Sequence, residues 1–297
     1  MKKQILCAGR LYCDLVFADA PRLPTLGTEV FAPTLSLRAG GGAFITGATL
    51  AALGHPVWQF STLPAAPFDT IVLTDMKEHC VVATACKPAA DGVDPQITVA
   101  IGSQSDRAFL TRADGPATPD PASIRFSDFS HLHIGELRTL QDMPVLLEMA
   151  RSAGLTISLD CSWQDGYDES VVDLIAAVDV FLPNEREVAA LATIGVPEAC
   201  ASLTVIKSGM DGARARMRND NAWTHSPATP VEVVDATGAG DAFNAGFLSS
   251  WLDQAPLAKC LSKGNDCGSA AVQALGGAGG LKQPIGSGQN LVDAVLG

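Results

Sequence analysis

The stretch Asp235-Ala236-Thr237-Gly238-Ala239-Gly240-Asp241-Ala242-Phe243 decides the architecture expected of this chain. It completes the apolar run Val231–Asp235, which predicts a strand, and leads into Ala239–Leu252, which predicts a helix. Gly238 and Gly240 make the connection a tight turn with almost no side chains. Such a turn at a helix N-terminus points unpaired backbone N–H groups at one spot, and the helix dipole adds partial positive charge. The stretch therefore predicts an anion hole suited to a phosphoryl group.

Asp241 falls in the first turn of that predicted helix, beside the anion hole. Phosphoryl transfer needs mainly positioning and charge neutralisation, with a base that orients the attacking hydroxyl. A carboxyl with an ordinary pKa of about 3.9 is ionised at neutral pH and can accept that proton. The alternative is that Asp241 only complements the helix dipole, as acids in a first turn often do. The neighbouring Asp235, Gly238 and Gly240 favour the catalytic interpretation.

Two other phosphate-binding motifs do not fit the sequence. It contains no Gly-x-x-x-x-Gly-Lys-Ser/Thr, which excludes a P-loop enzyme. Gly238-Ala239-Gly240 begins like a dinucleotide fingerprint, but Phe243 stands where the third glycine belongs. The motif also lies late in the chain rather than in a first β–α unit, so a dinucleotide-dependent dehydrogenase is disfavoured.

Upstream of this stretch, predicted helices alternate with short apolar strands. The helices span about 137–153, 170–178 and 185–192, and the strands about 155–159, 180–182 and 203–206. A hairpin is predicted between about 213–217 and 223–225, and a last helix over about 257–275. Alternation of this kind implies parallel pairing in a doubly wound sheet.

The first part of the chain adds a buried strand and two helix-free pieces. Ile5–Gly9 predicts the strand, and the glycines at 40–42 precede a helix over Ala43–Leu53. The segments of about 11–32 and 86–112 are strand-like. We therefore expect residues 1–297 to form one domain, a three-layer α/β/α core with a mostly parallel sheet. The two segments are expected to form a small β-strand lid over the carboxyl ends of the core strands, where ligands bind in open α/β sheets.

Composition and charge narrow the function classes. The 297 residues carry a formal net charge of -12, which disfavours non-specific nucleic-acid binding. None of the 8 cysteines forms a Cys-x-x-Cys pair, so a zinc site is not expected. No secretory signal opens the chain, and no apolar run is long enough to span a membrane. Free thiols without a signal sequence predict a cytoplasmic protein.

The opening stretch resembles the C-terminal signature of the ribokinase-like (PfkB) carbohydrate kinases, usually Asp-Thr-Thr-Gly-Ala-Gly-Asp-x-Phe, with Ala236 in place of a threonine. The resemblance implies ATP-dependent phosphorylation of a hydroxyl group of a small sugar, of the ribokinase or fructokinase kind. It makes Asp241 the general base and Gly238, Ala239 and Gly240 the anion hole. It also implies ATP and Mg²⁺ as cofactors and, as in several relatives, a monovalent cation such as K⁺.

Matches to the family's acceptor side are spread over the first half of the chain. The resemblance assigns acceptor binding to Asp14, Gly41, Gly42, Thr46, Arg107 and Glu136. Thr46 replaces the usual asparagine, and Arg107 has a second interpretation as the partner of a nearby acid. Ser162 and Gln164 replace the asparagine and arginine of the frequent Asp-x-Asn-x-Arg, which removes a phosphate-facing charge. These departures leave the identity of the acceptor open.

Matches to the nucleotide side are spread over the second half. The resemblance assigns nucleotide binding to Asn184, Lys207, Gly209, Gly212 and Asn265. Asn184 and Glu187, three residues apart on one helix face, are expected to hold Mg²⁺ through its waters. Asp235 and the loop 276–280 are the expected frame of the monovalent cation. Two of these matches have simpler readings, because Asn184 can merely cap a helix and Lys207 can merely be solvated.

Other functions remain open alongside the sugar kinase. A nucleoside kinase of the adenosine or pseudouridine type fits the same motifs with a larger acceptor pocket. A catalytically silent sugar or nucleotide sensor is the rival from another class, although a sensor has little need of Asp241, Asn184 and Glu187 together. The expected partners are the small-molecule acceptor and ATP, with neither nucleic acid nor membrane. Unpaired lid strands also predict a homodimer formed through the lid.

Overall fold

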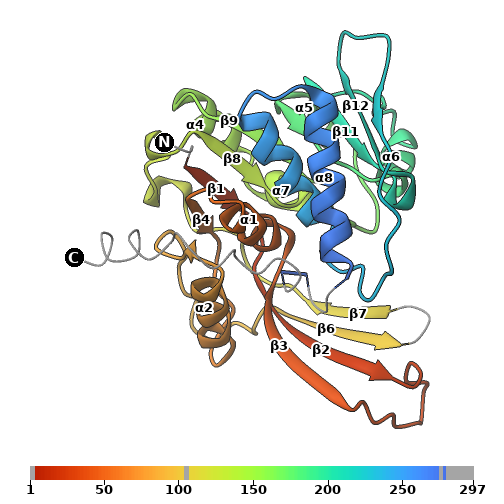
Figure 1. Ribbon diagram of the computed structural model, residues 1–297. Helices are drawn as coiled ribbons and strands as arrows, with labels where there is room; N and C mark the ends of the chain where they lie inside the picture. The colour runs from red at the N-terminus through yellow and green to blue at the C-terminus, as the bar shows by residue number, and fades with distance from the viewer. Residues whose placement is uncertain (1–3, 104–106, 274–276, 279–297) are drawn as a thin grey trace.

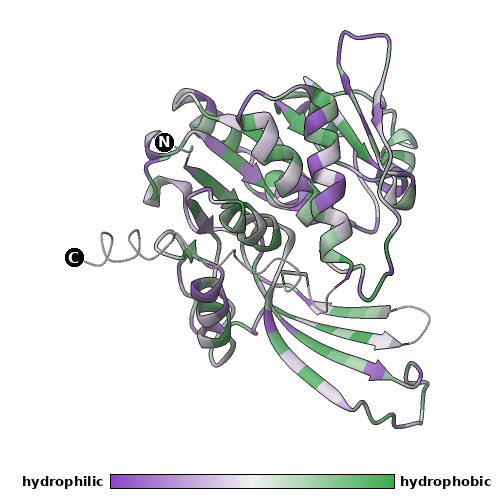
Figure 2. Cartoon of the chain, viewed as in Figure 1, coloured by the Kyte–Doolittle hydropathy of each residue, from purple (hydrophilic) through white to green (hydrophobic). Residues whose placement is uncertain are grey.

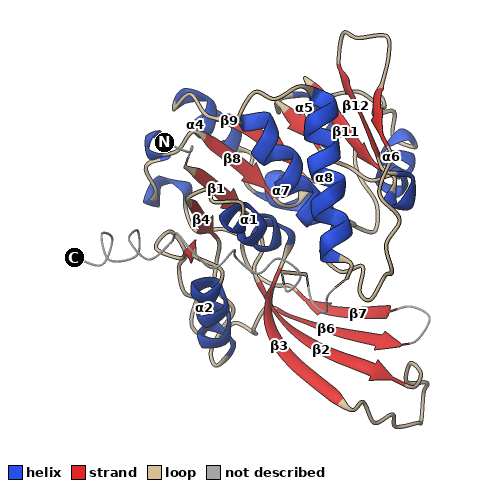
Figure 3. Cartoon of the chain, in the orientation of Figure 1, coloured by secondary structure: helices blue, strands red, loops and turns tan. Residues whose placement is uncertain are grey.

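The computed structural model describes residues 4–103, 107–273 and 277–278. Its strands form two sheets, a larger one in the order β13-β12-β11-β10-β9-β8-β1-β4-β5 and a smaller one in the order β3-β2-β6-β7 (Figures 1 and 3). The larger sheet comprises β1 (Ile5–Ala8), β4 (Val57–Phe60), β5 (Val81–Val82), β8 (His131–Ile134), β9 (Thr156–Leu159), β10 (Val180–Phe181), β11 (Leu203–Lys207), β12 (Ala213–Met217) and β13 (Thr224–Ser226).

The larger sheet is parallel from β5 to β11, and only β12 and β13 run antiparallel at one edge. Its central strands are buried along their whole length, as strands covered on both faces should be. The covering helices are α1 (Gly42–Ala52), α2 (Phe68–Glu78), α3 (Leu137–Asp142), α4 (Val145–Ser152), α5 (Val171–Ala176), α6 (Glu185–Ala192), α7 (Ala239–Leu252) and α8 (Leu257–Ala271).

Two apolar cores lie on the two faces of this sheet. One core contains side chains of α1, α2, α7 and α8, including Phe44, Met76, Phe247 and Leu261. The other contains side chains of α3 to α6, including Leu137, Leu146, Ile175 and Leu191. The result is the three-layer α/β/α core that the sequence predicts (Figure 1).

The smaller sheet projects from the core beside α2 (Figure 1). It comprises β2 (Tyr12–Ala20), β3 (Thr34–Gly40), β6 (Ile97–Ser103) and β7 (Arg107–Arg112). β2 pairs antiparallel with β3 and parallel with β6, and β6 pairs antiparallel with β7. Asp14 lies on β2, and Gly41 directly follows β3. The smaller sheet therefore joins the core at the glycine run that precedes α1.

Several predicted elements differ from the observed ones. The predicted helix over 137–153 is two helices, since Pro144 interrupts it between α3 and α4. The predicted strand Val231–Asp235 is not a strand; the N–H groups of Val234 and Asp235 instead donate to the carbonyl of Val272 beyond α8.

The remaining differences concern extents and omissions. The helix expected over 257–275 ends at Ala271. β3, β4 and α2 were not predicted. Because β3 belongs to the smaller sheet, the first lid segment reaches residue 40 rather than 32. Three short 3-10 turns complete the described residues, at Pro121–Ser123, Phe126–Asp128 and Gly209–Asp211. Within the described ranges, none of the helices combines the length and apolar character needed to cross a membrane.

Candidate functional site

The turn that precedes α7 has the conformation that the glycines allow. Gly238 is the N-cap residue with φ of 71°, in the left-handed region that favours glycine. A Cβ atom on Gly238 would come within 2.6 Å of the Cα atom of Gly277, so the turn packs closely against the segment beyond α8. In the described chain, the backbone N–H groups of Gly240 and Asp241 have no recorded acceptor. The N-terminus of α7 therefore presents free donors, as an anion hole requires.

Asp241 is held in the first turn of α7 by contacts with α1. The hydroxyl of Thr46 donates to the backbone carbonyl of Asp241 at 3.1 Å. A Cβ atom on Gly42 would lie 2.8 Å from Oδ1 of Asp241, so only glycine lets the start of α1 approach this carboxylate. Burial, followed by the charge of Asp160, raises the pKa of Asp241 to about 7, while Lys207 acts in the opposite direction. The geometry thus joins the two glycine motifs at one carboxylate.

A cavity of about 340 Å³ opens in front of Asp241. We refer to it as the Asp241 cavity; its lining residues are Asp160, Ser162, Trp163, Asn184, Glu187, Lys207, Gly209, Gly240 and Asp241. These residues come from the ends of β9 and β11, from the start of α6 and from the start of α7. They meet at the carboxyl edge of the parallel strands, the place where open α/β sheets bind ligands.

Lys207 lies at the base of this cavity and does not extend into solvent. Its Nζ atom contacts both carboxylate oxygens of Asp160, at 3.0 and 3.1 Å, and donates to Oδ1 of Asn244 at 3.2 Å. The amide of Asn244 in turn donates to Oδ2 of Asp160 at 2.6 Å. This closed triad of Lys207, Asp160 and Asn244 ties together the ends of β9 and β11 and the first turns of α7. The solvated alternative for Lys207 is therefore wrong.

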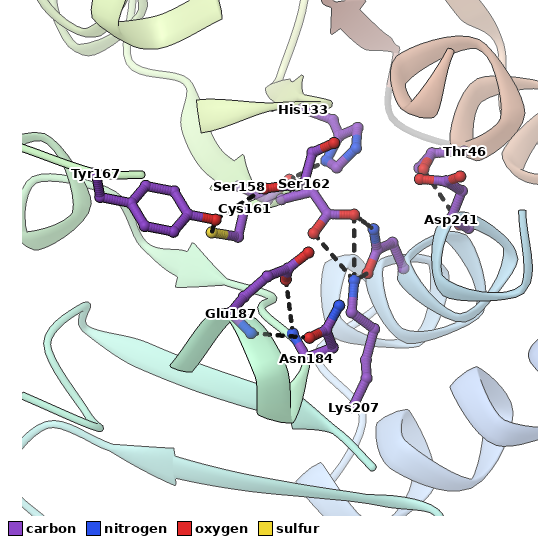
Figure 4. A network of polar contacts seen from close by, with 12 residues as sticks. Thr46, His133, Ser158, Cys161, Ser162, Tyr167, Asn184, Glu187, Lys207 and Asp241 are labelled. Atoms are coloured by element: carbon purple, nitrogen blue, oxygen red, sulfur yellow. Dashed lines mark hydrogen bonds and ion pairs between the residues drawn. The ribbon is translucent and has the colours of Figure 1, made fainter. Parts of the chain in front are cut away.

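Asn184 and Glu187 form a reciprocal capping box at the start of α6. Oδ1 of Asn184 accepts from the N–H of Glu187 at 3.0 Å, and Oε2 of Glu187 accepts from the N–H of Asn184 at 2.8 Å (Figure 4). The pair thus has the capping role that the sequence left as an alternative. Burial, then the charge of Asp160, raises the pKa of Glu187 to about 7. Among the described residues, no group of three or more His, Cys, Asp and Glu side chains is arranged to hold a metal ion.

Asp14, on β2, and Glu136, at the N-cap of α3, are not among the residues that line the Asp241 cavity. A Cβ atom on Gly40 would come within 2.0 Å of Oδ2 of Asp14, so the end of β3 packs directly on that carboxylate. Burial raises the pKa of Asp14 to about 7, against a hydrogen bond from Thr98. Glu136 accepts the N–H of Arg10 at 3.0 Å through Oε1. Both carboxyl groups lie near the Gly41–Gly42 turn, where Gly41 has φ of 105°.

Thr46 occupies a different position from the one expected of an acceptor ligand. Its side chain is fully buried, and its hydroxyl is used by the bond to Asp241. Arg107 lies on β7, but its side chain falls outside the described residues, as do residues 276, 279 and 280 of the expected cation loop. Asp235 accepts from the N–H and hydroxyl of Thr237 at 2.9 and 2.7 Å, which shapes the turn before Gly238.

Of the other expected nucleotide residues, Gly209 lines the Asp241 cavity, whereas Gly212 and Asn265 do not. Gly209 and Gly212 have φ of 58° and 91°, and a Cβ atom on Gly212 would come within 2.1 Å of the carbonyl of Ser226. Asn265 donates to the carbonyls of Ser226 and Pro227, which fixes α8 against the end of β13. These contacts give the loop after β11 its shape.

Three further residues of the site were not singled out from the sequence. Asp160 was seen only as part of a degenerate motif, although an acid directly after a buried strand is a usable signal. Asn244 is polar within an apolar helix, one turn after Asp241, and is completely buried. The sequence did not predict that Trp163 lines the cavity, because its position depends on the path of the loop after β9.

A family model for pfkB family carbohydrate kinases matches residues 2–284. The chain belongs to the pfkB family. This pfkB kinase is 26% identical over 275 residues to the ATP-dependent ribose-1-phosphate kinase of Halopiger xanaduensis, with 90% of each chain covered. It is also 42% identical over 86 residues to the aminoimidazole riboside kinase of Salmonella typhimurium, covering 27% of this chain and 26% of the relative.

Among solved structures, the pfkB kinase resembles Arabidopsis thaliana ribokinase complexed with ribose and ATP. The TM-score is 0.78 at 18% identity, and the match covers 95% of this chain and 96% of the other. The fold predicted from the sequence, a ribokinase-like core with a small sheet as lid, is therefore confirmed. This pfkB kinase is a phosphotransferase that uses ATP to phosphorylate a sugar or nucleoside.

Proposed function

We propose that this kinase transfers the γ-phosphoryl group of ATP to a hydroxyl of a small sugar, with Asp241 as general base. One observation supports this proposal most strongly. The Asp241 carboxylate, in the first turn of α7, lies beside the free N–H groups of the Gly238–Gly240 turn and in the same cavity as Asn184 and Glu187. The hydroxyl gives its proton to Asp241 while its oxygen attacks phosphorus. The N–H groups stabilise the charge on the transferred group.

The acceptor's other hydroxyls are assigned to Asp14, Glu136 and the Gly41–Gly42 turn. Carboxylates accept hydrogen bonds from adjacent hydroxyl groups, and these two lie near the same glycine turn. Arg107 remains a proposed acceptor ligand. We propose that Thr46 acts on the acceptor only indirectly, by fixing the backbone of Asp241.

ATP is assigned to the edge formed by Gly209, Gly212 and Asn265, with its terminal phosphate at Gly238–Gly240. Asp160, Glu187 and Asp241 surround the Asp241 cavity, and Lys207 is the positive side chain among its lining residues. This excess of carboxylate oxygen fits a hard divalent cation. Mg²⁺ would be held near Asn184 and Glu187 through its waters, and it would neutralise phosphate charge when bound. A monovalent cation beside Asp235 is the corresponding proposal for K⁺.

A nucleoside kinase is the second candidate, because an aromatic side chain, Trp163, lines the Asp241 cavity. One partial relative is named as an aminoimidazole riboside kinase, whose acceptor name combines a sugar with a heterocycle. The silent sensor is disfavoured, since Asp241, Asn184 and Glu187 are all present at one cavity.

The proposed partner besides substrates is a second copy of the chain, bound through the small sheet. Leu35, Leu37 and Leu110 are 53%, 38% and 75% exposed. The strand registers place them on one face with Leu15, Phe17, Val99 and Ile101, and Figure 2 shows hydrophobic stretches along these strands. An exposed apolar sheet face of this kind favours self-association. The free cysteines fit the proposed cytoplasmic location.

The test is ADP release from MgATP across a panel of pentoses, hexoses and nucleosides. The wild type is expected to release ADP with at least one acceptor. Asp241→Asn is expected to lower kcat by at least 10²-fold, in line with the usual contribution of a positioned base. Asp253→Asn, at the exposed C-terminal end of the same helix, is the matched control and should keep wild-type turnover. Near-full turnover by Asp241→Asn would show that the assigned base is wrong.

A further inference from the structure

Trp163 is an exposed aromatic side chain on the wall of the Asp241 cavity. It is 66% exposed and lines the cavity together with Gly240 and Asp241. The other tryptophans have packing partners: Trp58 packs edge-on against Phe129, Trp251 against His131, and Trp223 lies under Arg214 and Arg216. Within the described part of the chain, no ring or cation contact of this kind is recorded for Trp163. Its indole face is therefore available to a ligand.

The loop that carries Trp163 is anchored on both sides of the ring. Ser162, with φ of 55°, turns the chain, and the hydroxyl of Tyr167 donates to the Ser162 carbonyl at 3.1 Å (Figure 4). The same hydroxyl contacts Sγ of Cys161 at 3.2 Å, and Gln164 donates to Gln141 at 3.3 Å. These contacts fix the chain on both sides of Trp163, so the loop itself loses little conformational freedom when a ligand stacks there.

The charges around the cavity restrict what can stack there. Asp160, Glu187 and Asp241 line it, and the single charge of Lys207 is already used by Asp160. An anionic substituent of the acceptor would meet these carboxylates. A flat uncharged ring would not, and it gains from contact with the indole face.

The position of Trp163 relative to the sugar ligands points in the same direction. Asp14 and Glu136 come from β2 and the start of α3, whereas Trp163 comes from the loop after β9. A Cβ atom on Gly42 would lie 2.8 Å from Oδ1 of Asp241 and 2.9 Å from the carbonyl of Gly135, the residue before Glu136, and Asp241 also lines the cavity with Trp163. Asp241 therefore adjoins both groups of residues. A sugar held by Asp14 and Glu136 with one hydroxyl at Asp241 therefore leaves the Trp163 wall to a substituent of that sugar.

We propose that Trp163 is a stacking platform for a planar, uncharged heterocycle attached to the acceptor sugar, which favours the second candidate named above, a nucleoside, over a free sugar. This inference rests on the proposed function, because it assumes that the acceptor hydroxyl lies at Asp241. The heterocycle belongs to the acceptor, since the loop assigned to ATP leads from Gly209 toward Gly212 and Asn265.

The experiment compares two acceptors that share a sugar, cytidine and ribose, each with saturating MgATP. The wild type is expected to use cytidine with at least tenfold higher kcat/KM than ribose. Trp163→Ala should raise KM for cytidine on the order of 5- to 100-fold, as loss of base stacking does. It should lower kcat/KM for cytidine far more than kcat/KM for ribose, and the KM for ATP should change less than the KM for cytidine. Trp163→Phe keeps a ring and should retain most of the preference, and Trp223→Ala should behave as wild type.

Each other result overturns the inference in a distinguishable way. Equal use of ribose and cytidine, unaffected by Trp163→Ala, would show that the ring has no acceptor role. A rise in KM for ATP alone would place the stacked heterocycle in the nucleotide. A loss for hexoses but not for cytidine would assign the indole to a sugar face.

A binding measurement separates this inference from the proposed function. Cytidine should quench tryptophan fluorescence in the absence of ATP, and Trp163→Phe should abolish that quenching. Quenching without any ADP release would retain the platform and reject the kinase roles assigned to this site. ADP release without quenching would retain the kinase and reject the platform.

Discussion

Asp241 shares its surroundings with Asp160, Glu187 and Glu136, and one lysine opposes them. Burial and these negative neighbours make its proton harder to remove, so the pKa rises to about 7. A base must be unprotonated before it can accept a proton. The rate of this enzyme should therefore depend on the ionisation of Asp241 near neutral pH.

We predict that kcat/KM for the acceptor rises with pH through about 7, the pKa of Asp241. Below that value the protonated fraction grows, and the rate should fall about tenfold for each pH unit. The measurement is a pH profile from about 5.5 to 9 at constant ionic strength with saturating MgATP. A flat profile down to pH 5.5 would contradict the raised pKa.

Asp14 carries a cost in stability that we expect to depend on pH. Its pKa is raised from 3.8 to about 7 in the folded protein, so the native state keeps a proton that the unfolded chain releases. Stability contributed by this group is therefore lost as pH rises between those values. Asp14→Asn should raise Tm at pH 8 and change it much less at pH 4, while weakening acceptor binding.

The control for Asp14→Asn is Asp19→Asn, on the exposed end of the same strand. It should leave Tm unchanged at both pH values. An equal change in Tm at pH 4 and pH 8 for Asp14→Asn would rule out titration as the cause.

The sequence predicted most of these residues but not what they touch. Asp241, Asn184 and Glu187 stand in recognisable motifs, so their nearness to one cavity could be anticipated. Lys207 and Thr46 were assigned to ligands, yet both turn inward: Lys207 to Asp160, and Thr46 to the carbonyl of Asp241. Spacing along the chain cannot reveal such pairings, because they join residues 47 and 195 positions apart.

At the scale of elements, the central relation is the contact between α1 and α7. α1 follows the lid strand β3, and α7 carries the base, so their contact connects the acceptor side to the phosphoryl side. The Thr46 hydroxyl of α1 donates a hydrogen bond to the backbone carbonyl of Asp241 in α7, which links the two helices at the base.

Thr46→Val should lower kcat severalfold with little change in KM for ATP. Valine keeps the buried volume but removes the donor, and one such bond is worth about 1 kcal/mol. Thr49→Val is the matched control, since the Thr49 hydroxyl is also buried in α1 and has no hydrogen-bond partner among the described residues. Steady-state kinetics of both variants test the idea, and equal effects would reduce Thr46 to a packing role.

Elements were predicted best where apolar patterns were strong and unbroken. The parallel strands of the second half were recovered because each is a short buried run between helices. β3, with exposed leucines and an internal arginine, has no strong pattern, and its strand state depends on pairing with β2. Val231–Asp235 has the composition of a strand but pairs with no described strand, because its N–H groups at Val234 and Asp235 donate to the carbonyl of Val272, and Val233 and Val234 stay exposed.

The whole molecule consists of a core that places the chemistry and a small sheet with an open apolar face. We predict that Leu110→Arg shifts the protein from dimer to monomer in size-exclusion chromatography with light scattering. Leu110 is 75% exposed, so a charge there should disturb a partner more than the fold.

Thr34→Arg provides the comparison for the oligomeric state. Thr34 pairs with Ala18, which the strand alternation places on the opposite face from Leu110. This variant should keep the wild-type mass. A monomeric wild type, or dissociation by both variants alike, would reject the proposed interface.

The packing of Gly277 against Gly238 has a practical consequence for proteolysis and truncation. A chain cut after Ala271 would keep every helix and strand that the structure describes, and its circular dichroism should look close to native. It would nonetheless lose the glycine that borders the anion hole on one side. Truncation after Ala271 is therefore expected to abolish kinase activity without unfolding the protein. A native circular dichroism spectrum would then not show that a preparation is active.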